Sequence, residues 1–584
     1  MLFISNVVST ERNMMIKKPV IIFIAGLLFI GCCSLQAQDE EPEPRLLVSV
    51  TLKSYTECVS NFVNVVNAVV PGMGMMVQQR VPQIIGSPVL QGIDRDKPVY
   101  VYIGFIAKDL PGITGIFIPV TDFGAFRTGL QETSFLKKTK FGPNHIEQTG
   151  EYALVVMNIQ KDTQNGLFKA TDYISSFKKW RSENEPHHMI SVVMRVEPVR
   201  DALLAQIQQA RKTIVPLLAM ISGAQAGAAD PESIKKILGI YFEALQALVT
   251  GIDNAVLNFD MNDQKIIVQT VAHPVKGGPT EKYFAPPESD IKKIIGLANS
   301  NAQLMYAGIL GDKTPIMAEF KKIIPLSLKM QGLDGETAGK MNELINTSMD
   351  LMIPCLFMGA LDISPEGFAV EYAIKLDEKR ASGFCEQLGL FYKDIEKLAG
   401  PDKLYKKIEY RKDVRKVEGM PVDRLTLEYN MDHPQAAMLK QAGIGALKEM
   451  IFEYTTVGDT VVMASPSKFD ALVQKVRKGG NGSSITVRDN TVLKGSLNIV
   501  ECMKGIMGVI TTIPPHIKNI CQGMPSAGTA IECDLVLNNT ADIKMTIPVQ
   551  LLKTAGMLFL QIKTLQQGMQ PGKPPVGPVP PPVF

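Results

Sequence analysis

Histidine is the first residue type to examine for chemistry, because imidazole can act as a general base or bind a metal ion. The chain has six: His145, His187, His188, His273, His433 and His516. His187 and His188 are adjacent, and neighbours on an extended segment point to opposite faces, so a solvated loop is expected. His273-Pro274 and His433-Pro434 end strand-like runs at matched places, which allows either a shared polar site or simple strand termination.

Carboxylates and glycine-rich loops are the next candidates. Asp94 and Asp96 could hold a metal ion together, but Arg95 and Lys97 neutralise them, so a charged turn is expected. The glycine-rich stretch at residues 479–484 lacks the Lys-Ser/Thr pair of a phosphate-binding loop and favours a flexible connection. Motifs of serine hydrolases, nucleotide-binding folds, zinc proteases and EF-hands are missing from the sequence. We therefore assign no catalytic, cofactor-binding or metal-binding residue and favour a non-enzymatic protein.

Six cysteines follow the N-terminal leader: Cys58, Cys355, Cys385, Cys502, Cys521 and Cys533. Their spacing fits no zinc motif. In an exported protein the last three are close enough in sequence to form one local disulfide. Buried free thiols that behave as small apolar side chains are the alternative.

The N-terminus is typical of an export signal. Lys17 and Lys18 precede an apolar run at residues 19–30, which is well short of the roughly 20 residues that a membrane-spanning helix needs. Met14 or Met15 is a plausible alternative to Met1 as the start of the translated chain. An exported protein is therefore expected.

Cys32 is the predicted lipidation site. The run from Leu28 to Cys32 resembles a bacterial lipoprotein box, with Phe29 where leucine is usual. Cleavage after Ala37 is the alternative, so the signal peptide lies within residues 1–37 in either case. The acidic, Pro-rich residues 38–44 then form a tether. The protein is expected in the cell envelope as an outer-membrane or periplasmic-side lipoprotein that contacts the membrane through its lipid, or otherwise as a periplasmic or secreted protein.

Composition excludes one class of partner. The 584 residues hold 61 Lys plus Arg against 58 Asp plus Glu, with no long block of either charge, so nucleic-acid binding is not expected. The 29 methionines suit irregular core packing or an adaptable apolar pocket.

The chain repeats two kinds of unit. Apolar strands followed by amphipathic helices are expected at residues 45–66, 189–210, 302–323 and 492–513. Hairpins are expected at residues 256–271, 356–376 and 531–547. Such units form antiparallel sheet.

Two long helices precede hairpins and carry apolar residues at helical spacing. The first stripe comprises Ile234, Ile237, Leu238, Tyr241, Leu245 and Leu248, and the second Met341, Leu344, Ile345, Met349 and Met352. Core packing is the expected role of both stripes, and a cofactor groove is the alternative.

The units recur in the same order, which predicts an α+β protein of two pseudo-repeated halves, each mainly antiparallel sheet packed with amphipathic helices. The glycine-acid pairs at Gly150 and Gly458, each before a short strand, support this pairing. The halves are placed at residues 45–290 and 300–565. Residues 566–584 are expected to form a disordered Pro-rich tail.

Three segments carry a resemblance to known proteins: residues 92–105, 115–130 and 458–476. In these strand, turn and helix patterns the chain resembles exported bacterial proteins, often lipoproteins, with duplicated α+β halves. The resemblance would cover most of residues 45–565, and it implies architecture only. The functions that we consider are a binding or structural role in the envelope, a carrier or sensor of apolar ligands or lipids, and an enzyme with dispersed site residues.

Overall fold

The computed structural model describes residues 45–70, 72–76, 78, 91–105, 113–132, 145–158, 174–182, 186–226, 231–278, 280–311, 321–326, 335–401, 403–433, 448–480, 485–510 and 512–568. Cys32, the signal peptide and the tether lie outside these residues, as do residues 569–584 of the predicted tail. Lipidation, cleavage and the tail's disorder therefore stay predictions.

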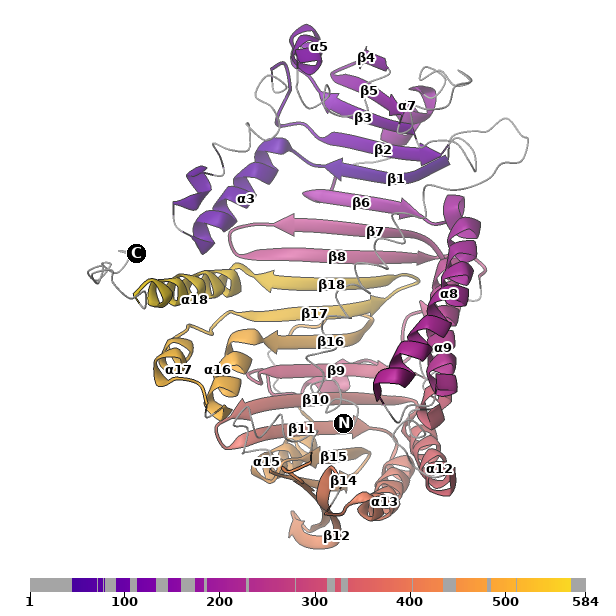
Figure 1. The fold of residues 1–584 in the computed structure, drawn as a ribbon, viewed down its shortest axis with the longest axis vertical. Helices are drawn as coiled ribbons and strands as arrows, with labels where there is room; N and C mark the ends of the chain where they lie inside the picture. The colour runs from indigo at the N-terminus through magenta and orange to yellow at the C-terminus, as the bar shows by residue number, and fades with distance from the viewer. Residues whose placement is uncertain are drawn as a thin grey trace.

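One antiparallel sheet of eighteen strands dominates the described chain (Figure 1). Along the sheet, the strands follow the order β4 (His145–Thr149), β5 (Tyr152–Asn158), β3 (Ile113–Pro119), β2 (Val99–Phe105), β1 (Arg45–Leu52), β6 (Ile190–Arg195), β7 (Ile252–Met261), β8 (Lys265–Pro274), β18 (Ala541–Pro548), β17 (Ala530–Leu537), β16 (Thr491–Asn498), β9 (Leu304–Leu310), β10 (Cys355–Ser364), β11 (Gly367–Lys375), β15 (Thr460–Ala464), β14 (Glu449–Val457), β13 (Met420–Tyr429) and β12 (Tyr405–Val417). The predicted α+β class with antiparallel sheet is confirmed.

Helices flank this sheet. They are α3 (Tyr55–Val69), α5 (Phe123–Glu132), α7 (Ile174–Ser182), α8 (Arg200–Ala226), α9 (Pro231–Gly251), α10 (Lys292–Ile295), α12 (Gly335–Met352), α13 (Glu378–Ile395), α15 (Pro466–Arg477), α16 (Ile499–Val509), α17 (Pro515–Gln522) and α18 (Val549–Gly568), with short 3-10 turns at Glu197–Val199, Glu281–Tyr283 and Glu396–Leu398. Helix α18 includes Gln566, which was expected in the tail.

Three of the four predicted strand-helix units are present, as β1–α3, β6–α8 and β16–α16, and the three expected hairpins are β7–β8, β10–β11 and β17–β18. Of the fourth unit, at residues 302–323, the strand is β9, and residues 312–320 lie outside the described residues. Side-chain caps explain where two of these helices begin, because Ser54 accepts a hydrogen bond from the Glu57 N–H and Asn498 from the Glu501 N–H. Local sequence is therefore enough to position these elements.

The two halves of the chain meet at the pairing of β8 with β18. Outward from this junction, the first half follows the order β8, β7, β6, β1, β2, β3, β5, β4. The second follows β18, β17, β16, β9, β10, β11, β15, β14, and the hairpin β12–β13 extends it. The junction pairs eight residues of each strand, from Ala541 opposite Ala272 to Pro548 opposite Lys265.

Hydrophobic cores lie toward the two ends of the sheet. At the β4 end, α5 packs on one face through Phe126 and α7 on the other through Phe177 and Trp180. At the other end, α12 and α13 pack on one face and α10 and α15 on the opposite face. Helices α3 and α18 cover part of the middle of the sheet, where they pack in one cluster with Ile190, Phe259 and Ile266.

Candidate functional site

The two His-Pro sequences do not form a site together. His273 lies on β8 opposite Asn254, whereas His433 follows β13. Eight strands separate β8 from β13 in the sheet: β18, β17, β16, β9, β10, β11, β15 and β14. At about 4.8 Å per strand the separation along the sheet is about 43 Å. The expectation of matched places was wrong because the extra hairpin β12–β13 carries His433.

The other polar candidates take structural positions. His187 and His188 lie in the loop that precedes β6, as expected, and His188 Nδ1 lies 2.7 Å from Asp260 Oδ2. Asp94 forms the predicted charged turn, in which Lys97 contacts both Asp94 and Glu151. Gly479 and Gly480 have positive φ and end helix α15. Among the described residues no group of three or more His, Cys, Asp or Glu side chains could hold a metal ion.

All six cysteines downstream of the leader are free thiols in the structure. Burial raises the pKa of every one of them, to about 12 for Cys355 and about 11 for Cys385. A thiol is nucleophilic as the thiolate, which these environments disfavour. Cys355 and Cys521 are buried and the other four are partly exposed, so the structure agrees with the alternative of free thiols.

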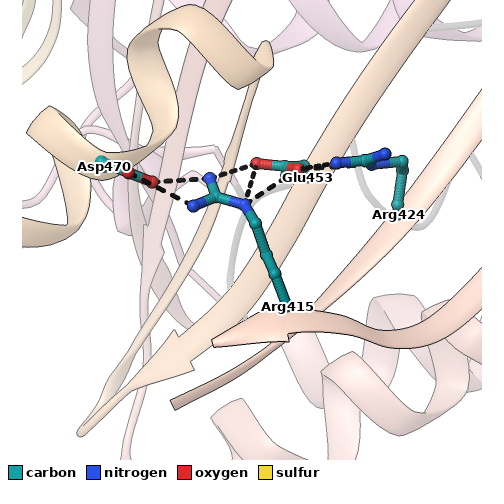
Figure 2. Close-up of polar contacts among 4 residues, drawn as sticks. All are labelled: Arg415, Arg424, Glu453 and Asp470. Atoms are coloured by element: carbon teal, nitrogen blue, oxygen red, sulfur yellow. Dashed lines mark hydrogen bonds and ion pairs between the residues drawn. The ribbon is translucent and has the colours of Figure 1, made fainter. Parts of the chain in front are cut away.

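Glu453 on β14 is a carboxylate with 0 % exposure (Figure 2). Arg415 on β12 donates from Nε to Oε1 at 3.1 Å and from Nη2 to Oε2 at 2.5 Å. Arg424 on β13 donates from Nη2 to Oε1 at 2.6 Å, and Arg415 also donates from Nη2 to Asp470 Oδ1 on α15 at 2.6 Å. The cluster joins three strands to a helix.

The ionised forms of the side chains in this cluster are favoured over their neutral forms. Burial by itself raises the pKa of Glu453, but the hydrogen bonds from Arg415 and Arg424 outweigh it and hold the pKa below its ordinary value. Hydrogen bonds to Glu453 and then to Asp470 raise the pKa of Arg415. Because guanidinium groups surround the buried carboxylate, we assign Glu453 to the fold and not to acid-base chemistry.

The middle of the sheet has one polar face, defined by Asn258, Gln269 and Asp542. Arg488 donates to Asp534 at 2.7 Å and to Asp542 at 2.6 Å. Gln269 on β8 donates to Asp542 on β18 at 3.0 Å, which links the two halves of the chain. These contacts tie the loop that carries Arg488 to the sheet, while Arg488 Nη2 is buried without a hydrogen-bond partner.

The opposite face of the same strands is apolar and partly uncovered. Leu257 on β7 lies opposite Thr270, Thr270 opposite Ile543, Ile543 opposite Leu535, and Leu535 opposite Leu493. Residues opposite one another share a face of the sheet, so these five side chains form one row across five strands. We call this row, with the neighbouring Met194 and Leu497, the open apolar face.

Exposure in this row is high for such side chains. Leu257, Ile543 and Leu493 are 44 %, 45 % and 39 % exposed. The row continues to both ends of the sheet, where α5 covers Ile116 and Val155, and α13 covers Ile374 and Val461. Exposed apolar surface that forms a contiguous patch marks an interaction site more often than scattered exposed residues do.

Helices α8 and α9 form an arm that packs mainly on itself and runs beside the strand ends (Figure 1). Arg200 ties the base of the arm by donating to the carbonyls of Val249 and Ile252. Tyr241 and Leu248 are 60 % and 53 % exposed, so the expectation of core packing was wrong for these two residues of the first helical stripe. The stripe of α12 is core as expected, with Met341 and Met349 buried.

An open surface pocket of about 540 Å³ lies where the arm meets the helical segment at residues 321–326. Its lining includes Arg211, Lys235, Lys236, Lys322, Ile240 and Leu326, and no carboxylate lines it. We call it the basic pocket. No sequence pattern predicts this pocket, because its cations come from three segments.

Comparison with known proteins adds no relative: no family model matches the chain, and neither curated proteins nor solved structures show a significant match. None of the helices in the described residues is long and apolar enough to cross a membrane.

Proposed function

We propose that this protein is an exported, lipid-anchored protein of the cell envelope that binds the acyl chains of lipids on its open apolar face. One observation carries the proposal: Leu257, Ile543 and Leu493 lie in one row and are each about two-fifths exposed. An enzymatic role has less support, because the polar candidates serve turns, caps and ion pairs.

The length of the exposed row favours lipid acyl chains as the ligand of the open apolar face. Leu257 and Leu493 are four strands apart, which is about 19 Å at the usual strand spacing. Half of a hydrocarbon core of about 30 Å is about 15 Å, so an extended acyl chain covers most of the row. Helices α3, α18, α17 and α16 lie along one side of the sheet and the arm along the other (Figure 1).

The N-terminal leader supports the same location. Lipidation at Cys32 would hold the chain at a membrane surface, where acyl chains are the abundant apolar ligand. We also propose that the two halves arose by duplication. The matched pairing orders support this, as do the tight turns at Gly150 and Gly458, whose φ values are +59° and +58°. The open apolar face would then lie across the junction of two copies.

The test uses a neutral apolar probe, pyrene-labelled diacylglycerol, and the purified protein. Ile543→Thr should weaken probe binding several-fold, and Leu257→Thr with Ile543→Thr by about tenfold. The expected size follows because full burial of such a side chain contributes about 1.5–3 kcal/mol, of which about two-fifths is available here. Threonine keeps the strand propensity, so the fold should persist.

Leu390→Gln is the matched control, because Leu390 on α13 is 46 % exposed and lies away from the face. It should leave binding unchanged. Native mass spectrometry of the protein should also show co-purified lipid. Equal effects of Ile543→Thr and Leu390→Gln would reject the proposal, as would a dimer that Ile543→Thr converts to monomer.

A further inference from the structure

Exposed apolar side chains gather on the helices along one side of the sheet. Within the described part of the chain, seven large apolar side chains that are exposed belong to α3, α16, α18 and the short helical turn at residues 73–76: Phe62, Met73, Met75, Met76, Ile506, Phe559 and Leu560. Phe559 is 66 % exposed and Met75 is 65 % exposed. Such a concentration of exposed apolar side chains marks an interaction surface.

These helices pack on one another along that side of the sheet, and we call α3, residues 73–76, α16, α17 and α18 the helical edge (Figure 1). Helix α3 packs closely on α18, because a Cβ added to Gly556 would lie 2.7 Å from the carbonyl oxygen of Val69. Helices α16, α17 and α18 share a core around Val500, Cys521 and Met524. The apolar interior of the helical edge is therefore filled without the exposed side chains.

Long parts of the helical edge carry no charge. The stretch from Cys58 to Gln78 contains no Asp, Glu, Lys or Arg, and neither does the stretch from Thr554 to Ile562. Charged residues make up 20 % of the whole chain, so this absence is unusual for an exposed surface. Because burial of an unpaired charge is costly, a charge-free surface can enter an apolar environment more easily than the rest of the molecule.

The charges that the helical edge does carry favour anionic headgroups. Each glutamate of its helices is paired with a lysine, Glu57 with Lys53 and Glu501 with Lys504. Lys518 on α17 and Lys553 on α18 form no ion pair with the residues that the structure describes. Cations beside exposed aromatic and aliphatic side chains are typical of helices that lie on anionic membranes.

The predicted lipid anchor can reach the membrane on this side of the sheet. Strand β1 begins at Arg45, and α3 follows its other end (Figure 1). The eight residues of β1 span about 26 Å. Residues 33–44 join Cys32 to Arg45 and can extend over about 40 Å. A lipid on Cys32 can therefore enter the same bilayer that the helical edge contacts.

We infer that the helical edge contacts the surface of an anionic phospholipid bilayer. Phe62, Met75 and Phe559 then lie in the boundary between headgroups and acyl chains, and Lys518 and Lys553 lie beside the headgroup phosphates. The inference rests on the proposed membrane location and adds which surface faces the membrane. The bilayer at the helical edge would also be the source of the acyl chains that the open apolar face binds.

The experiment places a tryptophan on the helical edge. The full chain is reconstituted into phosphatidylglycerol vesicles with brominated acyl chains, because bromine quenches tryptophan fluorescence on contact. The tryptophan of Phe559→Trp should lose about half of its emission, since interfacial helices lie about 5–10 Å deep in the boundary region. Trp180 is buried in the first half and gives the unquenched background. Leu390→Trp is the matched control, because Leu390 is 46 % exposed on α13, and it should keep its emission.

A second set of variants tests the contribution of charge. Lys518→Gln with Lys553→Gln, introduced into Phe559→Trp, should restore most of the emission, because the two cations no longer attract the anionic surface. Brominated phosphatidylcholine in place of phosphatidylglycerol should have the same effect. Lys212→Gln with Lys412→Gln removes the same charge from positions outside the helical edge and should leave the quenching unchanged.

Three results would overturn the inference. The first is equal quenching, or none, of Phe559→Trp and Leu390→Trp, and the second is a lysine pair that behaves like its control pair. The third is a native dimer that Phe559→Asp converts to monomer, which would assign the helical edge to a second copy of the chain. Quenching without binding of pyrene-diacylglycerol removes the proposed function and keeps the membrane contact, and the reverse result removes the membrane contact alone.

Discussion

At the scale of single residues, Glu453 shows how the chain keeps a charge inside a sheet. A buried carboxylate is costly unless charged donors compensate it, and here Arg415 and Arg424 approach from the two neighbouring strands. Asp470 Oδ1 accepts a hydrogen bond from Nη2 of Arg415. Each charged group stabilises the fold only while its partners are present. Loss of one member should therefore lower the free energy of unfolding by more than that member's own contribution.

Glu453→Gln should lower the free energy of unfolding by about 3 kcal/mol at pH 7, because it leaves two guanidinium groups without their carboxylate. Asp470→Asn is the control: Asp470 is 54 % exposed, so its loss should cost less than about 1 kcal/mol. Urea unfolding at pH 7 measures both. Equal costs would show that burial does not govern this cluster.

The effect of Glu453→Gln on stability should depend on pH. The pKa of Glu453 is lower in the fold than its ordinary value of 4.5, so its contribution is complete above that value and is lost as pH falls through the folded pKa. The difference in stability between the native protein and Glu453→Gln should be constant from pH 7 to 5.5. It should shrink below pH 4.5, as urea midpoints at pH 7, 5.5 and 3.5 would measure, and a difference that grows in acid would contradict this.

At the scale of elements, α9 and α12 have similar apolar stripes but different surroundings. Helix α12 packs with α13 on the sheet, whereas α9 packs on α8 in the arm. The stripe of α9 is therefore left partly exposed.

Leu248→Ala on α9 should change the free energy of unfolding by less than about 0.5 kcal/mol, because Leu248 is already largely in solvent. Met349→Ala on α12 should cost about 2–5 kcal/mol, because Met349 is only 9 % exposed. Chemical denaturation of the two variants compares them directly. A cost of 2 kcal/mol or more for Leu248→Ala would mean that the arm is covered in solution.

At the scale of the whole molecule, the pairing of β8 with β18 makes one sheet from the two halves. Every N–H of β18 faces either β8 or β17, so a proline there removes a hydrogen bond of the ladder. Trp180 is the single tryptophan and is buried in the first half, which makes its fluorescence a local reporter.

Thr546→Pro, within the junction, should therefore uncouple the halves. In the native protein the urea transitions of Trp180 fluorescence and of far-ultraviolet circular dichroism should coincide. In the variant they should separate, and Thr546→Ala should keep them together. Coincident transitions in Thr546→Pro would show that the halves are coupled elsewhere.

Much of the architecture could be predicted from local patterns. The alternation of apolar and polar residues around Ile543 identifies a hairpin strand, and Ser54 and Asn498 mark where α3 and α16 begin. The candidate site could not be predicted in this way. Alternation indicates that a strand has an apolar face, but it cannot show whether another element covers that face.

The sequence by itself determined the α+β class, the hairpins, most helix positions and the expectation of export with Cys32 as a lipid attachment site, because these depend on residues close together in the chain. Only the tertiary structure decided that one sheet unites both halves, that His273 and His433 lie far apart, and that the open apolar face and the basic pocket exist. These features depend on contacts between distant segments, and no local pattern specifies which of many apolar faces will be left without a partner.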